Sequence, residues 1–188
     1  MINARLIRPQ PGFTLIEVVV GIGVLAVVIF ALFNLYLAYG SLYTFQNTQL
    51  TTLADGRAAM AELTLFTIQA HRVVGNFTIA TTTYYSGTTT LALQIPAITG
   101  SSGIINNTWD YAVFYTSGAK FYRIIQADAA SYRVSGTKLL TDNLESLIIT
   151  FDNADLTQAK KVSIDLNIKN QKANYATANH LTEQLTLR

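Results

Sequence analysis

The chain has 188 residues, of which 50% are hydrophobic and none is cysteine. Without cysteine there is no disulfide, no thiolate zinc site and no cysteine nucleophile. The formal net charge is +2, and setting aside Arg5 and Arg8 leaves 11 basic residues against 11 acidic ones. This balance gives no electrostatic case for non-specific binding of nucleic acid.

An uncharged segment follows the first residues of the chain. Residues 18–54 contain no Asp, Glu, Lys or Arg, and about 20 apolar residues in a helix cross a bilayer core of roughly 30 Å. Residues 18–39 supply such a span. Because Arg5 and Arg8 precede it without an acidic residue, we predict that residues 1–12 stay in the cytoplasm and that the later residues form an extracytoplasmic domain on a single-pass inner-membrane anchor.

A removable secretory signal is the alternative interpretation of this segment, since it also has a basic start and an apolar stretch. The apolar run is longer than the roughly 7–15 residues of a signal core. Ala-Tyr-Gly-Ser at 38–41 matches a small-x-small cleavage site only weakly. The pattern therefore favours a retained membrane helix.

Glu17 interrupts the apolar pattern one position before the uncharged segment. An ionised carboxylate in or near hydrocarbon costs several kcal/mol unless it is paired, and such a group is a candidate for function. The alternative is a helix amino-terminal charge in the headgroup region, where the macrodipole favours it.

The string Gly12-Phe13-Thr14-Leu15-Ile16-Glu17 follows a short basic leader and precedes the apolar helix. It resembles the prepilin peptidase site of bacterial type IV pilins and type II secretion pseudopilins. The resemblance implies cleavage between Gly12 and Phe13 and N-methylation of Phe13. It also implies that Glu17 neutralises the amino terminus of a neighbour or of its own helix during assembly. The implied partners are the prepilin peptidase, other pilin or pseudopilin subunits and the inner-membrane assembly platform.

Helical periodicity continues beyond the span in an apolar stripe, which comprises Leu42, Phe45, Leu53, Met60, Leu63, Phe66, Ala70 and Val73. We expect one helix from about residue 14 to 72, with His71 and Arg72 in its last turn and Gly75 closing it. Many major pilins carry a proline at the position of Asn34, so this chain departs from the major-pilin pattern there.

Short β-rich runs follow from residue 77 onward. The expected strands are 78–83, 89–95, 111–116, 120–125, 144–151, 162–168 and 181–187. Ser117-Gly118 indicates a hairpin. We therefore predict an α+β fold in which a long N-terminal helix packs on an antiparallel β-sheet domain, as in pilins.

The expected organisation has four parts. Residues 1–12 form a cytoplasmic leader peptide, 13–39 a transmembrane and assembly helix, 40–75 an amphipathic stalk helix, and 76–188 a β-rich globular domain. Each part differs from the next in charge and hydrophobic periodicity.

Residues 109–188 resemble, more loosely, minor pilins and pseudopilins of the J and W type. The resemblance lies in the order of four segments, which are residues 109–115, 121–123, 139–147 and the final strand ending at Arg188. It implies a low-copy subunit at the tip of a fibre or one that initiates it.

Two further groups of residues bear on enzymatic and metal chemistry. His71 and His180 are the only histidines, and no Gly-x-Ser-x-Gly elbow occurs, so we predict no enzyme. Asp152, Asn153 and Asp155 offer oxygen ligands for calcium but lack the glycine and distal glutamate of an EF-hand loop, so we predict no metal and no cofactor.

An aromatic cluster lies in the strands, comprising Tyr84, Tyr85, Trp109, Tyr111, Phe114, Tyr115, Phe121 and Tyr122. No basic groove accompanies it, so nucleic-acid stacking is not predicted. We predict a structural subunit of minor type in a type IV pilus or a type II secretion pseudopilus. The alternatives are a major fibre subunit and a signal-anchored extracytoplasmic binding domain or enzyme.

Overall fold

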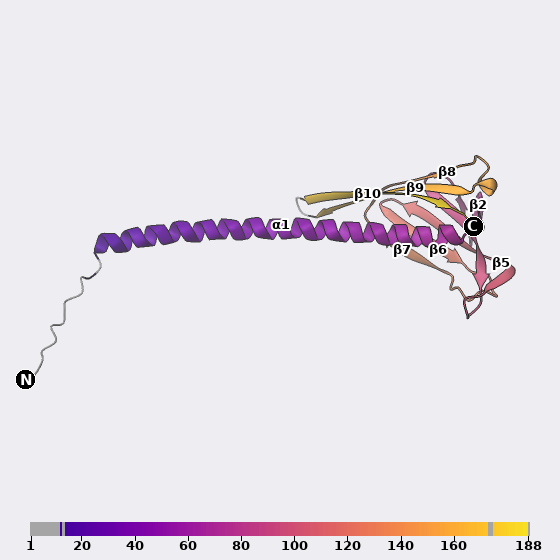
Figure 1. The fold of residues 1–188 in the computed structure, drawn as a ribbon, viewed down its shortest axis with the longest axis horizontal. Coiled ribbons are helices and arrows are strands. Elements are labelled where there is room, and N and C mark those ends of the chain that lie inside the picture. Colours follow the sequence, from indigo (N-terminus) through magenta and orange to yellow (C-terminus); the bar gives the residue numbers. More distant parts are fainter. Residues whose placement is uncertain (1–11, 13, 173–174, 188) are drawn as a thin grey trace, which may run out of the picture. The chain divides into compact units, whose positions relative to one another are not determined.

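The computed structural model describes residues 12, 14–172 and 175–187 (Figure 1). It divides into two compact units, residues 1–45 and 46–188.

Helix α1, Leu15–Gln69, contributes to both units. It begins where the sequence predicts but ends before His71 and Arg72. The His71 N–H donates to the Gln94 carbonyl at 2.8 Å, and strand β1, Arg72–Val73, pairs with the strand that contains Gln94. The expectation that these two cations occupy the last turn was therefore wrong, because the chain leaves the helix to join a sheet.

In the first unit, α1 is unbroken through Asn34. The Asn34 amide donates to the Phe30 carbonyl at 2.8 Å, and the hydroxyl groups of Ser41 and Thr44 likewise donate to carbonyl groups of the preceding turn. Such bonds satisfy polar side chains within the helix itself. Residues 18–45 of this helix are uncharged, and an uncharged helical segment whose polar side chains bond within the helix suits a hydrocarbon environment.

The second unit contains the strands, all of which pair antiparallel. A five-stranded sheet has the order β1-β4-β5-β6-β7, a three-stranded sheet has the order β10-β9-β8, and β2 pairs with β3. The remaining bounds are β2 Asn76–Ile79, β3 Thr82–Tyr85, β4 Thr90–Ile98, β5 Ile104–Ser117, β6 Lys120–Gln126, β7 Gly136–Thr141, β8 Leu144–Phe151, β9 Lys161–Lys172 and β10 Tyr175–Thr186. The 3-10 helix η1, Leu156–Gln158, lies between β8 and β9.

Residues 46–69 of α1 pack against both larger sheets, which Figure 1 draws on either side of this half of the helix. Phe66 contacts Phe114 of β5 edge to face, with ring centroids 5.9 Å apart. A Cβ added at Gly56 would lie 2.9 Å from Leu181 Cδ1 of β10, so glycine permits the close approach of helix and sheet. The α+β, pilin-like fold predicted from the sequence is confirmed.

The β2–β3 hairpin lies on the face of the five-stranded sheet opposite the helix. Phe77 stacks on Tyr111 with centroids 3.9 Å apart, and Tyr84 lies 4.9 Å from Tyr115. Burial and the neighbouring Tyr84 raise the pKa of the Tyr115 hydroxyl. The aromatic residues of the strands are thus divided between two places. Phe114 is buried in the core, whereas Tyr111 and Tyr115 contact the β2–β3 hairpin.

Candidate functional site

The predicted cleavage motif lies at the amino-terminal end of the described chain. Gly12 is exposed, and a Cβ added there would meet nothing within 4 Å. Phe13 lies outside the described residues, as do the leader residues Arg5 and Arg8. An exposed glycine before the helix lets the backbone adopt the extended conformation that the predicted cleavage would need.

Thr14 and Glu17 cap the first turn of α1. The Thr14 N–H donates to Glu17 Oε2 at 2.9 Å, and the Thr14 hydroxyl donates to the same oxygen at 3.0 Å. In return, the Glu17 N–H donates to Thr14 Oγ1 at 3.3 Å. This reciprocal arrangement is a capping box, which satisfies donors at the helix start that have no partner within the helix.

The capping box uses one carboxylate oxygen of Glu17. Within the described part of the chain, the hydrogen bonds to this side chain go to Oε2. The carboxylate therefore has a local role in the helix start. The sequence analysis gave two alternative interpretations of Glu17, a carboxylate with a role in assembly and a charge at the helix start. The geometry is compatible with both.

The rest of the first unit presents apolar side chains around α1. Large hydrophobic residues from Leu15 to Tyr43 are exposed, with Leu15 at 86%. By length and composition this helix is able to cross a membrane, with a mean hydropathy of 2.9 over its most apolar 18 residues. A helix that is apolar on all sides needs either lipid or neighbouring helices around it.

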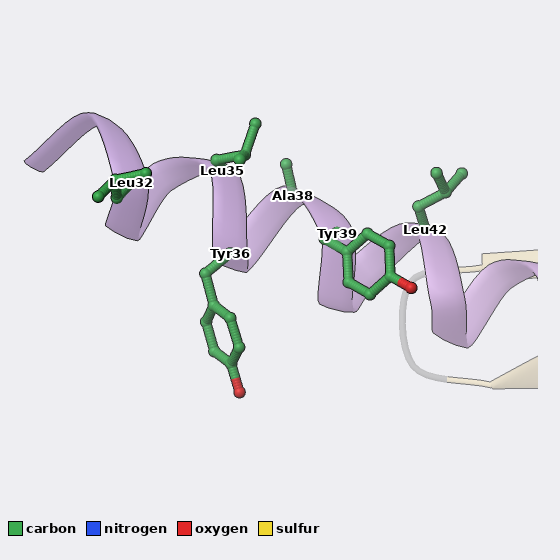
Figure 2. Close-up of a pocket in the computed structure, with 6 residues that line it drawn as sticks. All are labelled: Leu32, Leu35, Tyr36, Ala38, Tyr39 and Leu42. Carbon is green, nitrogen blue, oxygen red and sulfur yellow. The ribbon is translucent and has the colours of Figure 1, made fainter.

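A hollow of about 500 Å³ lies on this helix surface. Figure 2 shows its lining residues, with Leu35, Ala38 and Leu42 on one side of the helix and Tyr36 projecting from another. Every lining residue belongs to a single helix, so the hollow is a groove between neighbouring side chains. Ridges and grooves of this kind interlock when two helices pack.

Two ion pairs of Glu62 join residues 46–69 of α1 to the five-stranded sheet. Glu62 pairs with Arg123 of β6 and, at 2.9 Å, with Lys138 of β7. The Arg123 guanidinium also lies 4.9 Å from the centre of the Phe66 ring, a favourable cation–π distance.

A further ion pair is centred on Asp110 of β5, which is fully buried. Its carboxylate accepts from Arg133 Nη1 at 2.8 Å, from Ser131 Oγ at 2.7 Å and from the Asp128 N–H at 2.8 Å. Arg133 also donates to Gln69 at the end of α1. Asp110 thereby ties the loop between β6 and β7 to both the sheet and the helix.

The residues considered for calcium act in turns. Asp152 Oδ1 accepts from the N–H groups of Lys160 and Lys161, Asn153 accepts from Asp155, and Asp155 accepts from Thr157. Chiefly through the Lys161 bond, the pKa of Asp152 is lowered. Their side-chain oxygens therefore have partners, and no group of three His, Cys, Asp or Glu in the described ranges is placed to hold a metal.

The two histidines occupy exposed positions. His71 stacks on Trp109 with centroids 4.7 Å apart. His180 Nε2 lies 3.0 Å from Asp165 Oδ1, and Thr182 also donates to that oxygen. The Thr182 bond first and the His180 bond second lower the pKa of Asp165. Thr182 Oγ1 also lies 3.2 Å from His180 Nε2, so the three side chains form one exposed hydrogen-bonded cluster.

A comparison with protein families identifies a known motif at the start of the chain. Residues 7–33 match the model of the prokaryotic N-terminal methylation motif. The chain carries this prepilin-type motif. It supports a type IV pilin-like subunit that is anchored in a membrane and processed by a prepilin peptidase. Neither the curated proteins nor the solved structures gave a significant match.

The structure gives roles to several residues for which the sequence alone predicted none. Thr14 carried a readable signal, since Thr-x-x-Glu before an apolar run is a capping-box pattern. Asp110 and Arg133 lie 23 positions apart on a strand and a loop, and Glu62 meets Arg123 from 61 positions away. Only the folded chain brings these pairs together.

Proposed function

We propose that this chain is a structural subunit of a type IV pilus or a type II secretion pseudopilus. The prepilin peptidase removes residues 1–12 and methylates the new amino terminus at Phe13, and the mature chain then assembles through α1. The single observation that carries the proposal is the methylation motif over residues 7–33, followed directly by an exposed apolar helix.

Glu17 supplies the charge that directs assembly in this proposal. Cleavage creates a cationic amino terminus, and a carboxylate in an apolar fibre needs such a partner. Oε2 keeps the helix cap while the carboxylate pairs with that terminus. The partner amino terminus belongs to a neighbouring subunit or to the same helix.

The second unit extends the apolar surface along α1. Leu50, Leu65 and Ile68 are exposed, and Ala54, Ala58 and Ala61 between them are exposed as well. These positions recur every three to four residues and form one stripe. Helix packing against neighbouring subunits covers this stripe in the assembled fibre.

A low-copy role fits the departure from the major-pilin pattern at Asn34. Its amide bonds to the Phe30 carbonyl and the helix continues unbroken, whereas a proline would remove a helical hydrogen bond there. Together with the looser J and W resemblance of residues 109–188, this favours a minor subunit at the tip or in initiation. The globular domain is extracytoplasmic in this role.

Filament isolation tests the function. The full chain is expressed in its host with and without the prepilin peptidase, and sheared filaments are separated from membranes. The chain should enter the filament fraction only when the peptidase is present, and in far fewer copies than the main subunit. A fully processed chain that stays in the membrane fraction would contradict the structural role, and a dominant filament band would contradict the minor role.

A further inference from the structure

An open pocket lies beside the β2–β3 hairpin, within the second unit. Its volume is about 300 Å³, at the lower end of the range for small-molecule sites. The lining residues come from β2, β5, β6 and the loop after β6, and they are Phe77, Trp109, Tyr111, Gln126, Ala127, Asp128 and Ala129. The pocket therefore combines three aromatic side chains with an amide and a carboxylate.

Strand pairing brings the aromatic and amide side chains to one face of the five-stranded sheet. Trp109 and Tyr111 are two positions apart on β5, so their side chains lie on the same face. Gln126 of β6 is directly opposite Tyr111 in the antiparallel ladder, which places its side chain on that face as well. An amide thus lies beside an aromatic surface.

Two ring stacks hold the aromatic side chains in place. Phe77 of the hairpin stacks on Tyr111 with ring centroids 3.9 Å apart. His71 stacks on Trp109 with centroids 4.7 Å apart. Trp109 and Phe77 are nevertheless only half-buried, so part of each ring is accessible to a ligand. The aromatic side of the pocket is therefore formed before any ligand binds, which lowers the cost of binding.

The buried Asp110 fixes the loop side of the pocket. Its carboxylate accepts from the Asp128 N–H at 2.8 Å and from the Ser131 hydroxyl at 2.7 Å. Asp128 Oδ1 in turn accepts from the Ala130 N–H at 2.8 Å. A loop held by these bonds keeps its polar groups in one position, so fewer side chains have to be ordered when a ligand binds.

The charges around the pocket indicate a ligand without negative charge. The Asp128 side chain is exposed, and none of the described residues that line the pocket is Lys or Arg. A carboxylate or phosphate on the ligand would meet a like charge without a cation to offset it, which is unfavourable. Anionic ligands are therefore disfavoured.

A quaternary ammonium ion is another ligand of aromatic pockets, since it binds against the faces of several rings. The two stacks occupy ring faces that such a cage would use. Phe77 and Tyr111 cover each other with an interplanar angle of 15°, and His71 covers one face of Trp109. The Gln126 amide also supplies an N–H donor, for which a cation has no acceptor. A neutral ligand with hydroxyl groups can use both donors and acceptors.

We propose that this pocket binds a neutral hexose residue of a saccharide. The C–H groups on one side of a pyranose ring pack against the Trp109 indole, because the face of an aromatic ring carries partial negative charge. The sugar hydroxyl groups donate to the Asp128 carboxylate and exchange hydrogen bonds with the Gln126 amide. The pocket uses no residue of the methylation motif, so this binding function is additional to the structural role.

Tryptophan fluorescence tests the pocket directly, because Trp109 is the only tryptophan in the chain. The full chain is purified in a detergent that carries neither a sugar nor a choline headgroup. Methyl glucoside, methyl galactoside and methyl mannoside are then added in separate titrations. At least one of them should shift the emission to shorter wavelength and reach saturation, with a Kd on the order of 1–10 mM for a ligand of about a dozen non-hydrogen atoms.

The corresponding uronate tests the charge of the pocket. It replaces one sugar hydroxymethyl group with a carboxylate, which the Asp128 carboxylate repels. The uronate of the sugar that binds should therefore have a Kd at least about tenfold higher than the neutral sugar. In Asp128→Asn this difference between the two ligands should largely disappear, a result that a purely structural role of Asp128 would not produce.

Substitutions connect sugar binding to the lining residues. Asp128→Asn keeps the side-chain size and an acceptor for the Ala130 N–H, and it should raise the Kd for the neutral sugar about tenfold, since a hydrogen bond to a charged group is lost. Gln126→Ala should raise it about fivefold. Asp142→Asn is the matched control, because Asp142 is also exposed but does not line the pocket, and its Kd should be unchanged.

Three results would overturn the proposal. The first is the absence of saturable binding of all three sugars, by fluorescence and by titration calorimetry, at concentrations about tenfold above the expected Kd. The second is choline that binds more tightly than each sugar, which would identify a cation site. The third is an unchanged Kd in both Asp128→Asn and Gln126→Ala, which would place the sugar elsewhere. Processing at Phe13 is independent of each result.

Discussion

Thr14 and Glu17 bond to each other in both directions across the first turn of α1, with the Thr14 N–H 2.9 Å from Glu17 Oε2 and the Glu17 N–H 3.3 Å from Thr14 Oγ1. Glu17 therefore has a role in the isolated chain before any partner subunit is present. Its negative charge is not needed for that role, because glutamine also completes a capping box. Charge and cap can thus be separated by substitution.

Variants of this pair test the charge assigned to Glu17. Glu17→Gln keeps the cap and removes the charge, and Glu17→Val removes both. We expect both variants to be cleaved after Gly12 but to enter filaments at under about a tenth of the normal level, since they lack the charge that pairs with the amino terminus. Quantification of sheared filaments by immunoblot measures this.

Thr14→Ala is the matched control, because it removes the threonine hydroxyl and keeps the carboxylate. Loss of a cap costs only about 1 kcal/mol, so filament yield should stay near normal. Normal assembly of Glu17→Gln together with failure of Thr14→Ala would show that the cap, and not the charge, is what assembly requires.

Gly12 is expected to determine cleavage without affecting membrane insertion. Gly12→Leu introduces a branched side chain where the exposed backbone must fit a protease. The variant should accumulate as the uncut precursor in the membrane fraction, as measured by the mobility of the chain on a gel. Gly75→Leu serves as a control for glycine loss elsewhere and should be cut normally. Normal processing of Gly12→Leu would rule out the proposed site.

The buried Asp110 is expected to stabilise the second unit strongly. Asp110→Ala leaves the Arg133 guanidinium, whose side chain is 13% exposed, without its carboxylate. Removal of one partner from a buried ion pair costs about 3–5 kcal/mol. Thermal unfolding of the full chain in detergent, followed by circular dichroism, measures the loss.

The exposed pair between Glu145 and Lys169, 3.4 Å apart, provides the control for Asp110. Glu145→Ala should change the free energy of unfolding by less than about 1 kcal/mol, as is usual for surface ion pairs. Equal effects of the two alanine variants would mean that Asp110 does not tie the β6–β7 loop to the sheet.

Gly56 is expected to tolerate no larger side chain, since an added Cβ would lie 2.9 Å from Leu181 Cδ1 and 3.3 Å from Ile168 Cδ1. Gly56→Val should lower the free energy of unfolding by about 1–3 kcal/mol through overpacking. Ala58→Val, at an exposed position of the same helix, should cost less than about 1 kcal/mol. Leu181→Ala should recover part of the Gly56→Val loss, and the absence of any recovery would contradict the assigned contact.

Much of the fold was predictable because its patterns are local. Strand β8 matches the predicted run at both ends, Leu144 and Phe151, and the expected hairpin turn at Gly118 has φ of 59°. The run 78–83 was predicted as one strand but forms β2 and β3. Ala80 turns the chain there with φ of 54°, and alanine gives no sequence signal for that conformation.

Features that depend on long-range contacts were not predictable. Strand β7 was not predicted, because its extended conformation depends on pairing with β6. The helix was expected to reach residue 72, but the bond from His71 to Gln94 draws the chain into the sheet. The candidate site, in contrast, was predictable from the sequence. Gly12 and Glu17 lie within one short motif, which can be recognised without the fold.

Mass spectrometry of the mature chain tests the central claim most directly. The chain is isolated from its native host, digested, and its amino-terminal peptide is identified. Processing by the prepilin peptidase predicts a terminus at Phe13 that carries an N-methyl group, with residues 1–12 absent. An intact Met1 terminus in the membrane-bound protein would contradict the account.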